Sequence, residues 1–237
     1  MKITTINALI EILNSDSSVN RVYISTERKD KRIKELIELC KKRGVPFIKI
    51  PSNALEKKAG EKNQGVYAEI SPVKFSSIDD ITGKEAKGLI LVLDSVEDTG
   101  NLGAIIRSAA ACEVDGIIIS KRNSAPVNDT VMKTSAGTLS KVKIVQSTNL
   151  SNDMEILKKR GYWIAGSVAG EGIPYYDFDF SYPVAIIVGN EKKGISQLLK
   201  KNSDMLITIP HSNEVESLNV ATAAGIMLFE SYRKKKK

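Results

Sequence analysis

Apolar and polar residues follow two different patterns along the 237-residue chain. In the first third, apolar residues recur at helical spacing, as at Ile6, Leu9 and Leu13, between short runs that are typical of strands. In order, this pattern predicts a helix over 3–13, a strand over 21–25, a helix from its N-cap Asp30 to Gly44, a strand over 45–50, a helix over 53–59 and a strand over 65–70. These elements predict a compact α/β unit.

The second part of the chain contains apolar runs without alternation. We expect them to be strands over 88–94, 115–120, 141–145, 162–168, 183–189 and 205–210. Unbroken apolar runs are typical of strands buried on both faces, as in a parallel sheet covered by helices. The stretch between the two parts is polar and contains Pro, Ser and Gly. We therefore predict a domain over 1–72, a linker over 73–87 and a second α/β domain over 88–237.

The net charge of +7 is unevenly distributed. Residues 1–70 hold 14 Lys and Arg against 9 Asp and Glu, and the last five residues are all basic, whereas the remainder holds 16 against 19. A polyanion contacted by both ends would explain this pattern, because Lys and Arg release counterions from phosphates. The alternative is that the lysine-rich end is only a solubilising, frayed end of a helix.

Several classes of function lack their sequence signatures here. The chain contains no dinucleotide-binding, P-loop, zinc-protease or serine-hydrolase motif. Cys40 and Cys112 lie in apolar helical patterns without a C-x-x-C pair, so we expect buried reduced thiols and no metal site. The single histidine, His211, follows a proline in a loop. We expect it to be exposed to solvent rather than to take part in catalysis. We find no signal peptide and no long apolar run, and expect a soluble, cytoplasmic protein without membrane contact.

Polar and glycine residues gather after three of the predicted strands. They lie in the segments 93–107, 186–196 and 207–225. Because the carboxyl ends of parallel strands share one edge of a sheet, this is where a ligand would bind. Each segment also has a local structural interpretation. Asn101 and Ser217 would be helix N-caps, and Gly189 and Gly194 would be turn residues.

The same three segments resemble the motifs of the SpoU (TrmH) family of RNA ribose methyltransferases. The matching residues are Asn101-Leu-Gly-Ala-Ile-Ile-Arg107, Gly189-Asn-Glu-Lys-Lys-Gly194, and Ile209-Pro210 followed by Ser217-Leu-Asn-Val220. The resemblance implies that the second domain is a doubly wound parallel sheet with a deep trefoil knot, which holds the methyl donor S-adenosylmethionine (AdoMet). It also implies a homodimer formed through the knotted domain, with an RNA site that draws on both subunits.

The resemblance assigns roles to individual residues. Gly189, Ile209 and Leu218 would contact AdoMet. Arg107 would be essential, either as the base that accepts the 2'-OH proton or as a clamp on phosphate. We favour the clamp because a guanidinium stays protonated to about pH 12. Four further residues belong to the expected catalytic set: Asn101, Glu191, Ser217 and Asn219. Glu191 would orient Asn101 or Arg107 by a hydrogen bond, while Ser217 and Asn219 would hold ribose or phosphate, and no metal is needed.

Two stretches are similar to the RlmB-like branch of the family, which modifies large-subunit ribosomal RNA. Residues 122–142 are similar to the corresponding stretch of that branch, and residues 63–70 are similar to the end of its ribosomal-protein L30e-like RNA-binding domain. Asn63 stands where those relatives usually have histidine. The implied activity is 2'-O-methylation of a guanosine in 23S ribosomal RNA. The alternatives are a tRNA or another ribosomal RNA nucleotide as substrate, or a non-catalytic RNA-binding factor in ribosome assembly.

Overall fold

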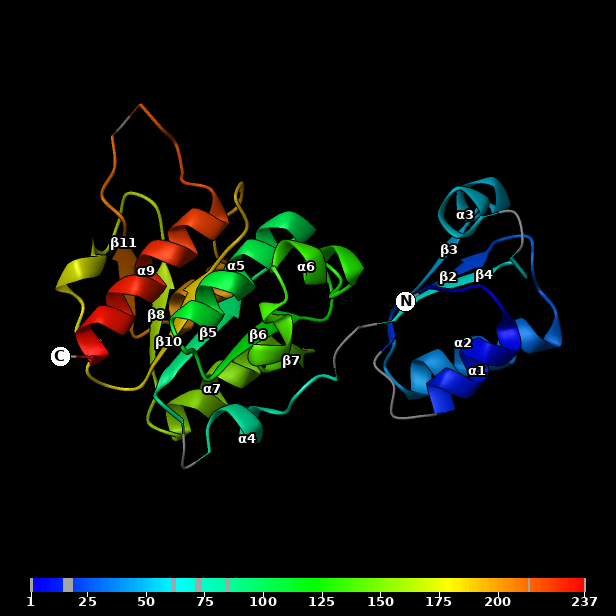
Figure 1. The fold of residues 1–237 in the computed structure, drawn as a ribbon, viewed down its shortest axis with the longest axis horizontal. Helices are drawn as coiled ribbons and strands as arrows, with labels where there is room; N and C mark the ends of the chain where they lie inside the picture. The colour runs from blue at the N-terminus through cyan, green and yellow to red at the C-terminus, as the bar shows by residue number, and fades with distance from the viewer. Residues whose placement is uncertain are drawn as a thin grey trace. The chain divides into compact units, whose positions relative to one another are not determined.

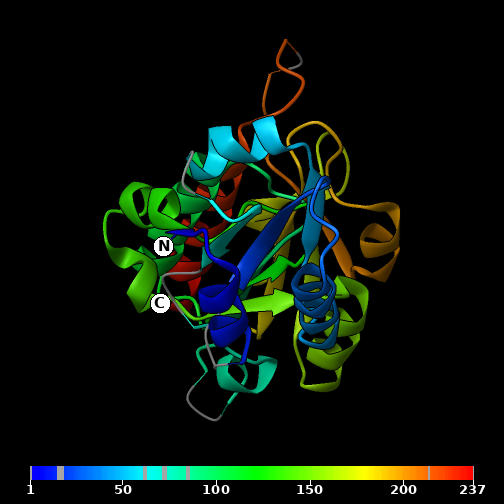
Figure 2. The same cartoon turned by 90° about the vertical axis from the view of Figure 1, so that its right-hand side faces the viewer.

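The computed structural model describes residues 2–14, 19–60, 63–70, 74–83, 86–212 and 214–236 (Figures 1 and 2). They divide into two compact units. The first comprises Met1–Lys74 together with Pro126–Asp129, and the second comprises Phe75–Ala125 and Thr130–Lys237. Each unit has its own sheet and its own apolar core.

The first unit is a small sheet with helices on both faces (Figure 1). Its elements are β1 (Lys2–Ile3), α1 (Ile6–Asn14), β2 (Val19–Ser25), α2 (Lys31–Lys42), β3 (Phe47–Ile50), α3 (Ser52–Ala59) and β4 (Val66–Ile70). The strand order is β1-β4-β2-β3, and only β2 and β3 run parallel. The sequence therefore predicted the helices and the longer strands of this unit correctly.

Alternation along the strands explains the two layers of helices. Val22 and Ile24 of β2 are buried in one cluster with residues of α1 and α2. Tyr23, between them, lies on the opposite face with Tyr67 and with Leu55 of α3. The two tyrosine rings stack with their centroids 5.6 Å apart. Successive side chains of a strand point to opposite faces, so one strand supports both helical layers.

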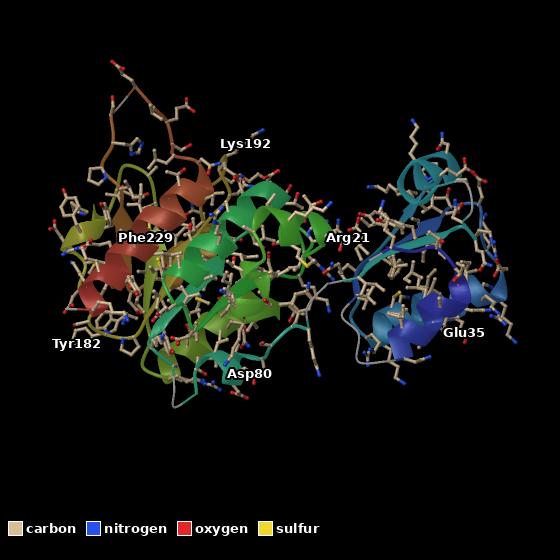
Figure 3. The ribbon with its side chains drawn as sticks, in the orientation of Figure 1. Arg21, Glu35, Asp80, Tyr182, Lys192 and Phe229 are labelled. Atoms are coloured by element: carbon tan, nitrogen blue, oxygen red, sulfur yellow. The ribbon has the colours of Figure 1, made fainter. Side chains whose placement is uncertain are left out.

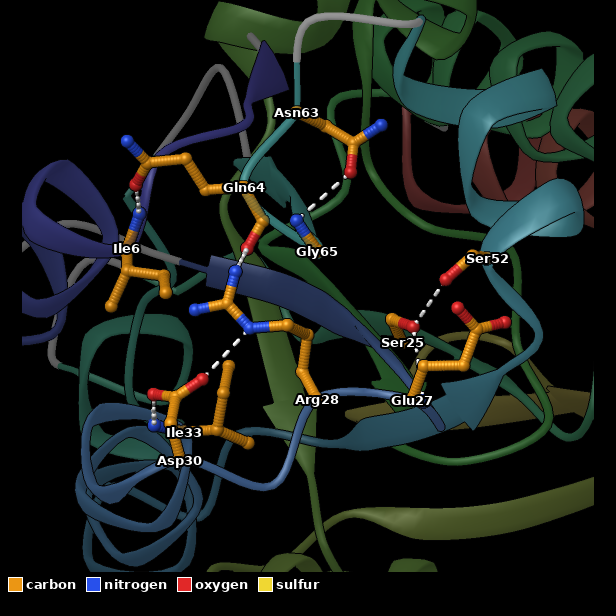
Figure 4. Close-up of polar contacts among 10 residues, drawn as sticks. All are labelled: Ile6, Ser25, Glu27, Arg28, Asp30, Ile33, Ser52, Asn63, Gln64 and Gly65. Carbon is orange, nitrogen blue, oxygen red and sulfur yellow. Dashed lines mark hydrogen bonds and ion pairs between the residues drawn. The ribbon is translucent and has the colours of Figure 1, made fainter.

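The polar contacts of this unit join its turns (Figure 4). Arg28 donates to the carboxylate of Asp30 at 2.7 Å and to the carbonyl of Gln64 at 3.1 Å. Asp30 caps α2 as predicted, and its hydrogen bond to Arg28 lowers the pKa of its carboxyl. Asn63 accepts from the backbone N–H of Gly65 at 2.9 Å and donates to the Gly60 carbonyl at 2.7 Å. These side chains are therefore used to hold turns.

The first helix begins later than the sequence pattern predicts. The apolar periodicity placed its start at Ile3, whereas Lys2 and Ile3 form β1 and α1 begins at Ile6. Ile3 pairs with Ala68 of β4, and the side chain of Gln64 accepts a hydrogen bond from the N–H of Ile6 at 3.0 Å. Both contacts come from about sixty residues away along the chain, so a local pattern cannot contain them.

The second unit is a parallel sheet covered by helices on both faces (Figures 1 and 2). Its strands are β5 (Leu89–Leu93), β6 (Gly116–Ser120), β7 (Ile144–Ser147), β8 (Trp163–Ser167), β9 (Ile173–Pro174), β10 (Val184–Val188) and β11 (Met205–Thr208). Its helices are α4 (Ile78–Ile81), α5 (Thr99–Ala111), α6 (Asp129–Thr134), α7 (Leu150–Lys159), α8 (Gln197–Asn202) and α9 (Val220–Lys235), with short 3₁₀ turns at Thr138–Lys141 and Tyr175–Asp177. All neighbouring strands are parallel, as predicted.

The strand order places a switch point in the middle of this sheet. The order is β7-β6-β5-β10-β8-β11-β9. The chain first moves outward from β5 to β7, then continues with β8 on the other side, and β10 enters between β5 and β8. The carboxyl ends of strands at such a point form a crevice, which is where open α/β sheets bind ligands.

Each face of this sheet has its own pair of helices. Ile90 and Val92 belong to a buried cluster with Met154 of α7 and Leu199 of α8. On the opposite face α5 packs against α9, and the intervening residues of β5, such as Leu91, are buried there. Within the described part of the chain, no helix is both long enough and apolar enough to cross a membrane.

Two features of this unit differ from the sequence expectations. The two-residue strand β9 was not predicted, since its short backbone pairing with β11 leaves no apolar pattern. Arg233, Lys234 and Lys235 of the basic C-terminal segment belong to α9, and the two lysines bind within the fold. The ammonium of Lys234 donates to the carbonyls of Tyr176 and Phe178, at 2.5 and 2.8 Å, and that of Lys235 donates to the carbonyl of Tyr182 at 3.0 Å.

Candidate active site

The three polar segments meet at the carboxyl edge of the parallel sheet. The second and third of them border a cleft of about 800 Å³, and the first contacts the wall of that cleft through Asn101, which bonds to Glu191. Its walls come from the end of β8, from the loop 189–195 after β10, from Ile209 after β11, and from residues 216–218 before α9. Among the predicted site residues, five line this cleft: Gly189, Glu191, Ile209, Ser217 and Leu218.

Close backbone packing shapes the loop after β10. Asn190 and Gly194 exchange two backbone hydrogen bonds of 3.1 and 2.8 Å, which turn the chain back on itself. A Cβ atom at Gly189 would stand 2.1 Å from the carbonyl carbon of Gly194, and Gly194 itself has a φ of +65°. Both positions therefore require glycine. The turn interpretation of these glycines is correct, and the turn forms a wall of the cleft.

A chain of side-chain hydrogen bonds joins the three segments beside the cleft. The amide of Asn101 donates to Glu191 Oε1 at 2.5 Å, and the amide of Asn219 donates to Asn101 Oδ1 at 3.0 Å. The hydroxyl of Ser217 lies 3.5 Å from the backbone carbonyl of Glu191. Glu191 thus bonds Asn101, which is one of the two partners considered for it.

The helix caps leave these amides available. Asp98 caps α5, accepting from the N–H of Asn101 at 2.7 Å, and Asn219 caps α9, accepting from Ala221 and Thr222 at 2.9 and 3.2 Å. The interpretation of Asn101 and Ser217 as the N-caps of these two helices is therefore wrong. Because Asp98 supplies the cap, the side chain of Asn101 is used for long-range contacts instead.

The cleft combines apolar walls with charged rims. Ile195, Ile209 and Leu218 line it beside the buried backbone of Gly189. Charged residues of both signs, among them Lys192 and the ion pair between Lys200 and Glu171, line the same cleft. Lys192 is exposed and extends outward from its loop (Figure 3). Apolar walls with a few placed polar groups are typical of sites for small organic ligands.

Arg107 is not among the residues that line the cleft. It lies in the third turn of α5 and is exposed, and its side chain makes no hydrogen bond or ion pair with any other residue that the structure describes. The neighbouring Ser108 faces α9, where its hydroxyl would be 3.7 Å from a Cβ at Gly225. The spacing from Asn101 was expected to bring both side chains to one edge of the sheet, but the structure brings only Asn101 to the hydrogen-bonded chain.

His211 lies closer to the site than the sequence indicated. It is half-buried, lines the cleft, and its Nδ1 lies 2.8 Å from the carbonyl of Ile209. Its position directly after Ile209-Pro210 was the signal that could have placed it there. Within the described residues, no group of three or more His, Cys, Asp or Glu side chains is arranged to hold a metal ion.

Two family models match the chain in succession. The SpoU rRNA Methylase family matches residues 88–229, and the substrate-binding domain of RNA 2'-O ribose methyltransferases matches residues 6–76. The chain belongs to the SpoU rRNA methylase family. It is an RNA methyltransferase of that family with an RNA substrate-binding domain ahead of the methylase domain.

Relatives of known sequence match over nearly the whole chain. YacO from Bacillus subtilis (strain 168), which is placed in the TrmH family of tRNA/rRNA methyltransferases, is 34% identical over 97% of this chain and 94% of its own length. A TrmH-family relative from Staphylococcus haemolyticus is 35% identical over the same shares.

Solved structures of SpoU methyltransferases share the fold. AviRb from Streptomyces viridochromogenes, crystallised with AdoMet, aligns with a TM-score of 0.64 at 23% identity, over 100% of this chain and 90% of AviRb. The A. aeolicus TrmH/SpoU tRNA modifying enzyme aligns with a TM-score of 0.59 at 28% identity, over 66% of this chain and 80% of its own. These alignments support the SpoU assignment at the level of architecture.

Proposed function

We propose that this SpoU protein transfers a methyl group from AdoMet to the ribose 2'-OH of a guanosine in 23S ribosomal RNA. The observation that carries the proposal is the chain of hydrogen bonds from Asn219 through Asn101 to Glu191 beside a cleft of suitable size. AdoMet supplies an electrophilic methyl on a sulfonium centre. In the reaction the ribose oxygen bonds to the methyl carbon, the carbon–sulfur bond breaks to leave S-adenosylhomocysteine, and the hydroxyl proton passes to water.

The cleft suits the donor in size and chemistry. Its volume of about 800 Å³ lies within the range of about 300–1,000 Å³ usual for small-molecule sites. The side chains of Ile209 and Leu218 would cover the purine, and the backbone at Gly189 would approach it closely. Charges of both signs at the rim match the ammonium and carboxylate of the methionine part. The residues proposed to bind AdoMet do not need to hold a metal ion.

The remaining residues would position the acceptor. Glu191 holds Asn101, which in turn holds Asn219, so the three side chains keep a fixed geometry beside the cleft, which Glu191 lines. Ser217 and Asn219 would contact ribose or phosphate. Alignment of the 2'-oxygen with the methyl lowers the barrier, because the two reactants are then held in a productive orientation.

We also propose that the domain over 88–237 contains the trefoil knot expected from the resemblance. The position of β10 between β5 and β8 and the packing of α9 against α5 support this proposal. The domain over 1–72 would be the L30e-like RNA-binding domain, acting on ribosomal RNA in the cytoplasm. Its match to the substrate-binding family supports that role.

A homodimer would complete the site. Phe229 on α9 is 52% exposed (Figure 3), and Ala104 and Arg107 are exposed on the adjacent helix α5. We propose that a second copy covers this surface of α5 and α9, so that Arg107 of one copy serves the RNA site of the other. There its guanidinium would clamp a phosphate and stabilise the developing alkoxide. A monomeric mass from light scattering at micromolar concentration would contradict the dimer.

Ribose-methylation mapping tests the proposed substrate. The 23S ribosomal RNA of a deletion strain should lack one guanosine 2'-O-methylation, as measured by mass spectrometry. Complementation with the gene should restore this modification. An unchanged methylation map would contradict the assignment to ribosomal RNA. Because relatives are named tRNA/rRNA methyltransferases, tRNA is the second candidate substrate. Labelling of purified tRNA and ribosomal RNA with tritiated AdoMet decides between them.

A further inference from the structure

One wall of the cleft is anchored by two residues that do not line it. The loop 189–195 contributes all seven of its residues to the cleft. Asp94 and Ser95, directly after β5, hold this loop at three points. The N–H of Asp94 donates to the carbonyl of Val188 at 2.9 Å, which fixes the start of the loop. The carboxylate of Asp94 accepts from the N–H of Ser196 at 2.7 Å, which fixes its end.

The third point lies within the loop. The amide of Asn190 donates to the carbonyl of Ser95 at 3.0 Å. Ser95 has a φ of +61°, a left-handed conformation that is uncommon for a residue other than glycine. Its hydroxyl donates to the second carboxylate oxygen of Asp94 at 3.0 Å. Asp94 is only 8% exposed, so both of its oxygens are used within the protein.

We infer that Asp94 is a positioning residue for the methyl donor, which holds the loop 189–195 in the shape that binds AdoMet. This inference rests on the proposed function. It follows because a buried carboxylate that accepts two hydrogen bonds is costly to remove, and because the part of the chain that it fixes is a wall of the cleft. Asp94 itself has no contact with the cleft.

The same fold provides matched controls at the opposite edge of the sheet. Asp115, before β6, accepts from the N–H groups of Lys87 and Leu89 at 2.6 and 2.8 Å. Asp204, before β11, accepts from the N–H of Ile164 and from Lys158, both at 2.8 Å. These carboxylates also join neighbouring segments, but they lie at the amino ends of the strands. Their removal should affect stability alone.

Calorimetric titration with AdoMet tests the inference on the full-length protein. Asp94→Ala should weaken donor binding about tenfold or more and raise the KM for AdoMet, with kcat little changed. Asp94→Asn should restore most of the affinity, because its amide can accept from Ser196 and donate to Ser95. Asp115→Ala and Asp204→Ala should bind AdoMet as the wild type does. Unchanged binding by Asp94→Ala, or an equal loss in either control, would overturn the inference.

A second pair of variants alters the donor of the hydrogen bond between the N–H of Ser196 and Asp94. Ser196 is exposed and has a φ of −61°, which proline can adopt. Ser196→Pro removes the N–H that binds Asp94, whereas Ser196→Ala keeps it. Only the proline variant should lose affinity for AdoMet. This pair decides the question if Asp94→Ala does not fold, and equal affinities in the two variants would contradict the role of Asp94.

Hydrogen exchange separates this inference from the proposed function. Without any ligand, the amides of residues 190–196 should exchange faster in Asp94→Ala than in the wild type, while those of β6 and β8 should not change. If the wild type fails to bind AdoMet, the proposed function is wrong, but the exchange result still shows whether Asp94 fixes the loop. Unchanged exchange over 190–196 would overturn the inference.

Discussion

The polar side chains of the two units make hydrogen bonds with different roles. In the first unit, Arg28 bonds to Asp30, and Asn63 bonds to Gly60 and Gly65 within its own turn (Figure 4). In the second unit, Asn101 and Glu191 bond across ninety residues of sequence and stand beside an open cleft. Contacts that close turns contribute to stability, whereas contacts that hold side chains at a cleft fix the geometry of a site. Substitutions at the turn contacts of the first unit should therefore affect stability, and substitutions at the cleft of the second unit should affect activity.

The largest effect is expected at Arg107. Arg107→Ala should lower methyl transfer by about 100- to 1,000-fold, the loss typical of removing a group that stabilises charge in a transition state. The melting temperature should not change, because Arg107 is exposed and has no partner among the described residues of one chain. Labelled-donor assays and calorimetry measure the two quantities.

The matched control for Arg107 is Arg160, at the amino edge of the sheet. Arg160 pairs with Asp79 and donates to Thr82. Arg160→Ala should retain methyl transfer within about twofold, since exposed ion pairs contribute little to stability. Full activity in Arg107→Ala would contradict the proposed role of this arginine.

A smaller effect is expected from a single methyl group at Gly189. The added Cβ would stand 2.1 Å from Gly194, so the loop must move, at a cost of about 1–3 kcal/mol in the free energy of unfolding. We expect Gly189→Ala to lose AdoMet binding as well, because the loop is a wall of the cleft. Gly83→Ala is the control, since its Cβ would meet nothing nearer than 3.6 Å. Wild-type affinity in Gly189→Ala would show that this loop does not contact the donor.

Asn63 in the first unit stands where the family resemblance leads us to expect histidine. Asn63→Ala should lower the free energy of unfolding of the first unit by about 1–2 kcal/mol, because two hydrogen bonds are lost. AdoMet binding should be unchanged. Asn63→His tests separately whether this position contacts RNA. A gain in affinity for ribosomal RNA without a change in AdoMet binding would show that residue 63 helps to bind the RNA substrate. An effect of either variant on AdoMet binding would contradict the division of roles.

The smallest effect concerns the thiols. Cys40 and Cys112 are free and buried, and burial raises the pKa of each thiol to about 11. Because the thiolate is the reactive form, both should react slowly with a disulfide reagent at pH 8 and become reactive only on unfolding. Rapid labelling of the native protein would contradict the burial of these side chains.

Much of the fold could be predicted because its signals are local. The apolar strands of the second unit and the amphipathic helix after Asp30 are visible within short stretches of sequence. The strands β1 and β9 were not predicted, because each has two residues and depends on a distant partner. The position of β10 between β5 and β8 is likewise a property of the whole sheet.

The candidate site likewise has features that the sequence predicted and features that it did not. That the three motifs meet at one end of the sheet follows from the common edge at which parallel strands end. The hydrogen bond from Asn219 to Asn101 depends on the path of the chain between them, and the sequence pattern does not contain that path. The exposed position of Arg107 was not predicted either, since the direction of a helical side chain depends on how the helix is rotated against its sheet.

We infer that the segments after β10 and β11, held in place by residues that follow β5, form one pocket for a methyl donor. Calorimetric titration of the purified full-length protein with AdoMet tests it most directly. We expect saturable binding of one donor per chain, weakened by Asp94→Ala and Gly189→Ala and unaffected by Asp115→Ala. No binding by the wild type, or equal binding by all four proteins, would contradict it.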